Sequence, residues 1–207
     1  MDSRVEAVLA EYHERGKREA QVFRELPPEE AMRRRDEFLL WVGPDTGTLL
    51  RLLAKGCGAR TILEIGTSYG YSTVWLADAA RHTGGTVITL ELDARKVEYA
   101  RGALQRAGLE DHVDFRIGDA LELLKQLPGP IDFVLLDLWK DLYVPCFDLF
   151  HPKLAEGAIV VADNMLEPPV ARPEAEKYRA HVRETGQYDS VLLPVGSGIE
   201  VSRRLAQ

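Results

Sequence analysis

Apolar residues occur along the chain in short continuous runs that alternate with longer segments of helical spacing. Five runs stand out, at 61–65 (TILEI), 86–90 (TVITL), 112–117, 131–136 (IDFVLL) and 158–162 (AIVVA). Continuous apolar runs of this length are typical of strands that are buried on both faces.

The segments between the runs carry apolar residues at helical spacing. They predict helices at 71–81, 93–106 and 120–127, and a partly helical segment at 144–154. Strand and helix in strict alternation predict a parallel sheet whose crossover connections are right-handed.

The C-terminal end follows a different pattern. After a predicted helix at 173–184, the runs SVLLP and IEVSRR flank the turn sequence VGSG at 195–198. Two short β-rich runs around such a turn predict an antiparallel hairpin. The expected fold is therefore α/β and Rossmann-like, with seven mostly parallel strands, helices on both faces and a C-terminal hairpin.

The N-terminal segment is patterned as helices laid against this core. Pro27 and Pro28 separate the first helix from the next, and a loop is expected at 41–47 before a helix at 48–55. The simplest organisation is one domain, 1–207, with a helical N-terminal extension at 1–56 and a Rossmann-like core at 57–207.

Composition indicates a soluble globular protein, with 45% hydrophobic and 29% charged residues. No apolar run approaches the roughly 20 residues of a membrane helix, and the charged N-terminus does not resemble a secretory signal. Cys57 and Cys146 form neither a disulfide framework nor a zinc signature, so a reduced, cytoplasmic protein is expected. The net charge of −7 argues against nucleic acid as the main partner.

Polar residues and glycines stand at or just beyond the end of every predicted parallel strand. They are Glu64, Gly66, Gly70, Glu91, Asp119, Asp137, Asp163 and Asn164. Each carboxylate or amide taken singly could be a helix N-cap. Taken together, the row predicts a ligand site at the carboxyl edge of the sheet, where doubly wound folds bind their ligands.

The loop after the first strand reads G-T-S-Y-G and differs from the dinucleotide fingerprint G-x-G-x-x-G. Glu91 lies about twenty residues after it, where an acid commonly accepts hydrogen bonds from ribose hydroxyls. This combination favours an adenosine-like ligand without a diphosphate. S-adenosylmethionine fits that description, with Asp119 near its adenine amino group.

Two motifs make a family resemblance specific. ILEIGTSYGYST (62–73) resembles the cofactor loop of the class I methyltransferases. DLWKDLY (137–143) followed by ADN (162–164) resembles the cation-dependent catechol O-methyltransferases and their caffeoyl-CoA relatives. The resemblance extends from about Val42 to Arg204.

This resemblance implies a set of functional residues. Asp137, Asp163 and Asn164 would hold a magnesium ion, and Lys140 would take a proton as the catalytic base. Glu91 would bind the ribose, and Trp139 would pack near the adenine. The implied cofactor contacts are Val42, Glu64, Gly66, Tyr71, Ser72, Glu91, Leu92, Asp119, Ala120, Asp137 and Trp139.

The chemistry of the implied ligands agrees with this assignment. Two carboxylates and an amide oxygen form a hard site that prefers Mg²⁺, or Ca²⁺ or Mn²⁺, over Zn²⁺. Three protein oxygens leave about three of the six octahedral positions of Mg²⁺ open. A small aromatic substrate with vicinal hydroxyls, such as a catechol, would fill two of them.

Several residues have a structural interpretation as well. Lys140 could be a surface lysine and Trp139 could pack in the core. Asp141 fits a helix N-cap better than a metal ligand, and Tyr143 fits a packing residue. The apolar residues 38, 40 and 41 either form a lip over the substrate or dock the N-terminal helices to the core.

The sequence departs from the family pattern at three positions that affect substrate choice. Leu138 stands in place of a histidine of the animal catechol enzymes, and Leu193 in place of an acid near their C-terminus. Ser197 replaces an acid of the caffeoyl-CoA branch. A caffeoyl-CoA-like thioester and hydroxylated uridine in transfer RNA therefore stay as alternative substrates.

Two other functional classes remain open: a nicotinamide-dependent oxidoreductase and a non-catalytic S-adenosylmethionine-binding protein. Relatives are often dimers, so a homodimer is an expectation by analogy.

Overall fold

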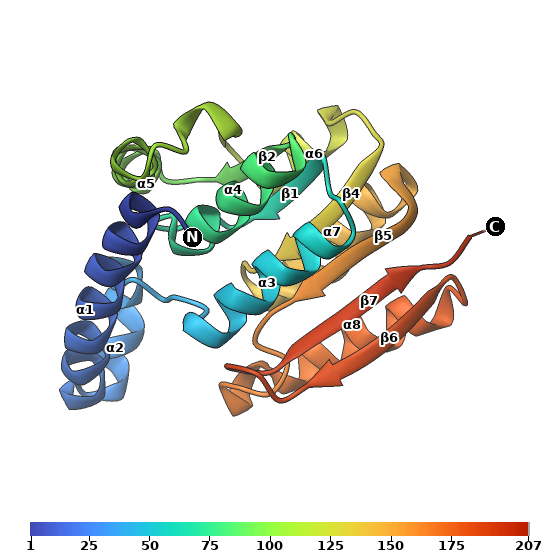
Figure 1. Ribbon diagram of the computed structural model, residues 1–207. Coiled ribbons are helices and arrows are strands. Elements are labelled where there is room, and N and C mark those ends of the chain that lie inside the picture. The colour runs from blue at the N-terminus through green and yellow to red at the C-terminus, as the bar shows by residue number, and fades with distance from the viewer. Residues whose placement is uncertain (207) are drawn as a thin grey trace.

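The computed structural model describes residues 1–206, without the side chains of Pro28 and Met32. Its centre is a seven-stranded sheet in the order β3-β2-β1-β4-β5-β7-β6 (Figure 1). The first five strands are parallel, and β7 runs antiparallel to both β5 and β6. The strands are β1 (Thr61–Ile65), β2 (Thr86–Glu91), β3 (Val113–Ile117), β4 (Ile131–Leu136), β5 (Leu154–Ala162), β6 (Tyr188–Leu193) and β7 (Ile199–Arg204). The predicted sheet and its C-terminal hairpin are confirmed.

Helices connect the strands and also form the N-terminal segment. They are α1 (Ser3–Glu25), α2 (Pro28–Arg34), α3 (Pro44–Gly56), α4 (Tyr71–Thr83), α5 (Ala94–Ala107), α6 (Ala120–Gln126), α7 (Tyr143–Phe150) and α8 (Arg172–Glu184). Short 3-10 helices lie at η1 (Arg35–Glu37), η2 (Glu110–His112), η3 (Lys140–Leu142), η4 (His151–Lys153) and η5 (Pro169–Ala171).

Two hydrophobic clusters, one on each face of the sheet, hold these layers together. One contains buried residues of α1, α3, α4 and α5, and the other contains buried residues of α6, α7 and α8. Figure 1 shows α3 and α4 in front of the strands and α7 and α8 behind them. Burial on both faces explains why the strands β1 and β4 are continuous apolar runs.

Helix α1 joins the first of these clusters directly. Its residues Val5, Val8, Leu9 and Tyr12 are at most 3% exposed and lie in the same cluster as Leu104 of α5. The N-terminal extension therefore shares a hydrophobic core with the Rossmann-like part.

Two elements begin four residues earlier than the sequence-based prediction. Residues 44–47 were expected in a loop, but α3 begins at Pro44 because Gly43 turns the chain at φ +83° and Pro44 fits the first helical turn. Strand β5 begins at Leu154 instead of residue 158. Its early part contains Gly157 at φ +73° and a register shift against β4, so it lacks an apolar strand pattern.

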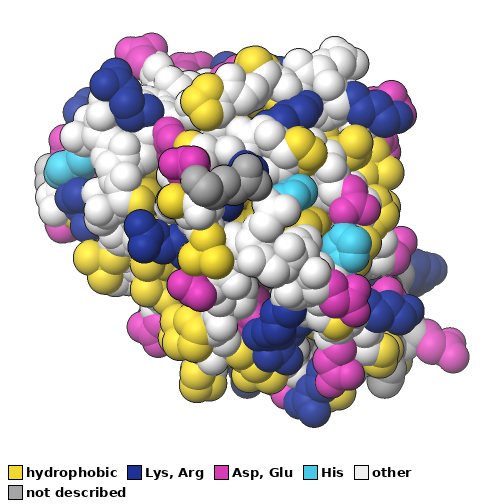
Figure 2. All heavy atoms as spheres, turned by 90° about the vertical axis from the view of Figure 1, so that its right-hand side faces the viewer, with side chains coloured by type: hydrophobic (Ala, Val, Ile, Leu, Met, Phe, Trp, Pro, Cys, Tyr) yellow, Lys and Arg dark blue, Asp and Glu magenta, His cyan; other side chains and the backbone are white. Residues whose placement is uncertain are grey.

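The helices and the surface bear on whether the chain has a membrane span or a strongly charged face. None of the helices in the described part of the chain has both the length and the apolar character that crossing a bilayer requires. On the face shown in Figure 2, acidic and basic side chains are interspersed with hydrophobic ones.

Strand register brings the carboxyl ends of four parallel strands to one edge. Ile65 pairs with Leu90 on β2 and with Leu136 on β4. Leu136 pairs in turn with Ala162 on β5. The next residues of these four strands therefore lie side by side, and they are Gly66, Glu91, Asp137 and Asp163.

Gly66 makes the closest backbone approach at this edge. Its φ is +104°, and a Cβ at this position would lie 2.0 Å from the carbonyl oxygen of Asp137. The Asp137 N–H donates to the carbonyl of Ile65 at 3.0 Å. Both the backbone angle and the contact require a residue without a side chain.

We predict that Gly66→Ala lowers the free energy of unfolding by roughly 3 kcal/mol or more, because it adds overpacking against Asp137 to the strain of the positive φ. Gly58→Ala is the matched control, since Gly58 has φ +66° but no atom within 4 Å of the added Cβ. The control should lose only about 1–2 kcal/mol. Urea unfolding of both variants measures the difference, and equal losses would contradict the role of the Asp137 contact.

Candidate active site at the carboxyl edge of the sheet

The loop between β1 and α4 is organised around the buried carboxylate of Glu64. This side chain is 0% exposed. It accepts hydrogen bonds from the hydroxyls of Ser72, Thr73 and Thr89, each at 2.6 Å. Burial raises the pKa of Glu64 to about 7, against the opposing effect of these three hydroxyls. Glu64 and Ser72, both predicted cofactor contacts, therefore bond to one another at the base of the loop.

Glu91 ties the same loop to the end of β2. One carboxylate oxygen accepts from the backbone N–H of Ser68 at 2.8 Å. The other accepts from the N–H groups of Leu92 and Asp93 at 2.9 and 3.0 Å. The oxygen that accepts from Ser68 has a second lone pair, so Glu91 can still accept a bond from a ligand hydroxyl at this edge.

Three further predicted cofactor positions lie at or beyond the ends of β2 and β3. Leu92 is 73% exposed at the edge. Asp119 is exposed and caps α6, accepting from the N–H of Glu122 at 3.1 Å. Ala120, half-buried, is the first residue of α6.

A narrow crevice separates the loop between β1 and α4 from the segment that leads into α3. Residues 39–42, 66–69, 71, 72 and Asp137 line a narrow space of about 10 Å³. A space of this size holds about one water molecule. Val42, Gly66, Tyr71, Ser72 and Asp137, all predicted cofactor contacts, line it together.

Helix α1 holds both walls of this crevice. On the loop side, the Tyr12 hydroxyl donates to the carbonyl of Tyr69 at 2.5 Å, and His13 is hydrogen-bonded to the Tyr71 hydroxyl at 2.9 Å. On the other side, Glu19 accepts from the N–H of Leu39 at 2.5 Å. These contacts could not be predicted from the sequence, because they join segments that are far apart in the chain.

The apolar residues 38, 40 and 41 were expected either to form a lip over the substrate or to dock the N-terminal helices. The structure separates Leu40 from the other two. Phe38 is buried with its ring 5.2 Å from that of Phe23, and Trp41 packs on Gly16 of α1. These two dock the N-terminal helices to the core. Leu40 is 47% exposed and has φ +43°, so it alone projects from this segment.

Trp139 lies exposed at the edge instead of in the core. It is 47% exposed, and the guanidinium carbon of Arg35 lies 3.8 Å from the ring centroid. A cation over an aromatic face at this distance is an attractive contact. The contact brings η1 against the loop that follows β4.

The predicted metal ligands and base form one cluster. Lys140 is partly buried, and its amine donates to the Asn164 side-chain oxygen at 3.1 Å and to the Leu138 carbonyl at 3.1 Å. It also donates to the Tyr143 hydroxyl at 2.5 Å. Lys140 is therefore no freely solvated surface lysine, and it lies beside one of the predicted ligands.

Burial dominates the electrostatics of this cluster. It raises the pKa of Asp137 and raises that of Asp163 to about 7, where the neighbouring Asp137 charge adds to the effect. Burial also lowers the pKa of Lys140, although the charges of Asp137 and Asp163 oppose the shift. Each charged form is costly in this environment unless an opposite charge accompanies it.

A divalent cation fits the residues that are present. Asp163 is 3% exposed, and its Oδ1 is buried without a hydrogen-bond partner among the described residues. Buried carboxylate oxygens normally have partners, so this atom indicates a missing ligand. No three His, Cys, Asp or Glu side chains of residues 1–206 gather into a metal-binding group. The candidate set is accordingly two carboxylates and the Asn164 amide.

Two neighbouring residues differ from their sequence-based interpretation. Asp141 was expected to cap a helix, but the residue before α7 is Leu142 and neither η3 nor α7 has a side-chain cap. Tyr143 is fully buried as expected, yet its hydroxyl also donates to the carbonyls of Leu136 and Asp163. It therefore links Lys140 to the ends of β4 and β5.

Comparison with known proteins agrees with this geometry. The sequence profile of the O-methyltransferase family matches residues 13–205. A catechol O-methyltransferase from Niastella koreensis is 40% identical over 129 residues, which cover 60% of this chain and 58% of that protein. Caffeoyl-CoA O-methyltransferase 1 from Eucalyptus globulus is 31% identical over 192 residues, covering 81% of this chain and 76% of that protein.

A solved structure shows the same fold. The O-methyltransferase from Bacillus cereus in complex with SAH superimposes with a TM-score of 0.73 at 28% identity, covering 99% of this chain and 91% of that one. The chain spans less than two thirds of the Niastella koreensis protein. The family profile, however, matches nearly all of the present chain. The protein therefore belongs to the O-methyltransferase family.

Proposed function

We propose that the protein transfers a methyl group from S-adenosylmethionine to one hydroxyl of a small aromatic vicinal diol, with Mg²⁺ as the required ion. The observation that carries this proposal is the cluster at the ends of β4 and β5. There the unpartnered oxygen of Asp163 lies on the residue next to Asn164, and Asn164 accepts from the Lys140 amine. The Niastella koreensis relative, a catechol O-methyltransferase, supports the substrate class.

Asp137, Asp163 and Asn164 are the residues that would hold the ion, and the crevice between 39–42 and 66–72 would receive the methionine end of the cofactor. SAH in the Bacillus cereus structure supports that cofactor. When bound, Mg²⁺ would supply charge that lowers the pKa of a phenol, and the sulfonium would supply an activated methyl group.

The chain's own contribution begins with proton transfer to Nζ of Lys140. This atom donates to three acceptors, so it must release one hydrogen bond and be neutral before it can accept a substrate proton. Burial favours the neutral amine. The Tyr143 hydroxyl and the Leu138 carbonyl fix the position of Nζ, which keeps the base at one place on the edge of the sheet.

Alignment of the reactants and exclusion of water would supply the rest of the rate acceleration. Orienting a nucleophile against its donor can contribute roughly 7–11 kcal/mol. The close packing of Gly66 on Asp137 fixes the cofactor loop against the ion-binding strand end. The walls held by α1 keep the crevice narrow, and a dry site favours a reaction in which two opposite charges disappear.

A caffeoyl-CoA-like thioester is the second candidate substrate. The Eucalyptus globulus relative aligns with a larger share of the chain than the catechol enzyme does, 81% against 60%. Comparing methyl transfer to caffeoyl-CoA and to free caffeate separates the two substrate classes. Membership of the O-methyltransferase family argues against the oxidoreductase alternative.

We predict that methyl transfer to catechol falls at least a hundredfold after EDTA treatment and returns when Mg²⁺ is added. Asp163→Ala should show the same loss, because it removes the buried oxygen without a partner. Asp141→Ala is the matched control, since this neighbouring acid is exposed. Transfer of label from S-adenosylmethionine measures the rate.

Thermal unfolding gives a readout that does not depend on turnover. Mg²⁺ at about one hundred times its dissociation constant should stabilise the wild type by about 2.7 kcal/mol, and it should have no such effect on Asp163→Ala. Activity that survives chelation, or a variant that Mg²⁺ stabilises like the wild type, would remove Asp163 from the ion site.

We predict that Lys140→Met lowers kcat by roughly 10²–10⁴, the range for loss of a general base, while the affinity for S-adenosylmethionine changes less than threefold. Lys125→Met is the control, because Lys125 is exposed and, among the residues that the structure describes, its side chain pairs with Glu122 alone. Single-turnover kinetics and calorimetry measure the two quantities. A variant with the wild-type rate would exclude Lys140 as the base.

A further inference from the structure

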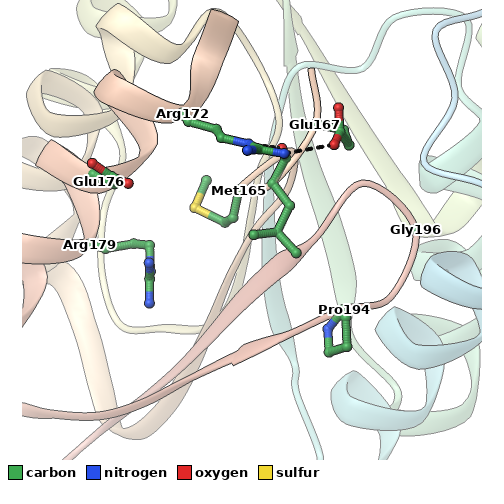
Figure 3. A pocket seen from close by; sticks show the side chains of 8 residues that line it. Met165, Glu167, Arg172, Glu176, Arg179, Pro194 and Gly196 are labelled. Atoms are coloured by element: carbon green, nitrogen blue, oxygen red, sulfur yellow. Dashed lines mark hydrogen bonds and ion pairs between the residues drawn. The ribbon is translucent and has the colours of Figure 1, made fainter. Parts of the chain in front are cut away.

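A second cavity lies on the β5 side of the candidate site, between α8 and the hairpin of β6 and β7. Its volume is about 410 Å³, within the range of small-molecule pockets. Figure 3 shows the residues that line it, which are Met165, Leu166, Glu167, Arg172, Glu176, Arg179, Pro194 and Gly196. Met165 follows Asn164 directly in the chain, so the cavity begins one residue beyond the predicted ion ligands.

The hairpin places the far wall of the cavity against the same strand end. Met165 donates from its N–H to the carbonyl of Gly198 at 2.8 Å. Glu200 on β7 pairs with Ala162, the residue before Asp163. A diol held at Asp163 and Asn164 therefore has this cavity as the neighbouring space for a substituent on its ring.

The positive charge on the cavity wall comes from Arg179, which shares its carboxylate partner Glu200 with Arg183. Glu200 is 1% exposed and accepts from Nε of Arg179 at 3.0 Å and from Arg183. Two guanidinium groups on one carboxylate leave one positive charge in excess. Arg179 is the one that lines the cavity, and its side chain is 25% exposed.

Arg179 also has donors to spare. Among the described residues, its side chain makes only the Nε bond to Glu200. A guanidinium has five N–H donors, so its terminal amino groups can bind a second carboxylate. Guanidinium and carboxylate match in geometry and form strong charge-assisted hydrogen bonds.

The other charged residues on the cavity wall affect a bound anion less than Arg179 does. Arg172 is neutralised by Glu167 at 2.9 Å, and Figure 3 shows this pair separate from Arg179. Glu176 is exposed, so solvent and salt screen its charge. The cavity therefore favours an anionic group at Arg179, with Met165, Leu166 and Pro194 as apolar contacts for the carbon chain that carries it.

The geometry points to an aromatic vicinal diol with a carboxylate on its side chain as the preferred substrate, the carboxylate being bound by Arg179. This inference rests on the proposed function, because the diol must sit at Asp137, Asp163 and Asn164. It narrows the substrate class from catechols in general to catechols with an acidic tail.

The test compares 3,4-dihydroxycinnamate, catechol and 3,4-dihydroxyphenethylamine as substrates in the presence of S-adenosylmethionine and Mg²⁺. In the wild type, kcat/KM for the carboxylate should exceed that for the amine at least tenfold. In Arg179→Gln, the ratio of kcat/KM for the carboxylate over catechol should fall at least tenfold. Arg179→Lys, which keeps the charge, should recover part of this ratio.

Arg183→Gln is the matched control, because Arg183 binds the same Glu200 but does not line the cavity. Its ratio should fall clearly less than that of Arg179→Gln, because Arg183→Gln removes the excess charge but keeps the free N–H donors of Arg179 in the cavity. Equal changes in the Arg179 and Arg183 variants would overturn the inference in favour of a structural role for the Glu200 network, and so would a wild type that prefers the amine.

Calorimetry in the presence of SAH and Mg²⁺ measures the dissociation constants of 3,4-dihydroxycinnamate and catechol. Their ratio tests the same preference without turnover. A wild type that binds 3,4-dihydroxycinnamate through Arg179 but transfers no methyl group would contradict the proposed function and leave standing only the role of Arg179 in binding the carboxylate. Turnover of catechol together with an unchanged ratio in Arg179→Gln would refute the inference alone.

Discussion

The contact between Gly66 and the carbonyl of Asp137 is the constraint on which the site depends. It joins the end of β1, where the loop toward α4 begins, to the end of β4, where the predicted ion ligands begin. A side chain at Gly66 would push these two strand ends apart, since the added Cβ would overlap the Asp137 oxygen. The parallel register of β1, β4 and β5 then carries the alignment on to Asp163.

Charge balance at the same edge explains why the residues occur as a group. Two acids whose pKa values are raised by burial stand beside an amine whose pKa is lowered by it. None of the three would be stable in its charged form without the others or a cation. The fold therefore stabilises the cluster only as a set, and the hydrogen bonds of Tyr143 hold that set in place.

The sequence predicted the sheet well because its strands are buried on both faces and leave continuous apolar runs. Strands β1 and β4 match the runs 61–65 and 131–136 residue for residue. The row of polar residues at the strand ends was also visible, because parallel topology brings such residues to one edge. The start of α3 was missed, since it depends on the positive φ of Gly43.

What the sequence could not predict is tertiary in origin. The bond from Lys140 to Tyr143, the sharing of Glu200 between two arginines and the contacts of α1 with the loop all need the folded chain. The last of these has a consequence for how the crevice changes shape. Because Tyr12, His13 and Glu19 are anchored in one rigid helix, the two walls cannot separate independently of it. Moving the two walls apart breaks at least one of these hydrogen bonds or moves α1 with them, so the N-terminal helix is mechanically coupled to the width of the crevice.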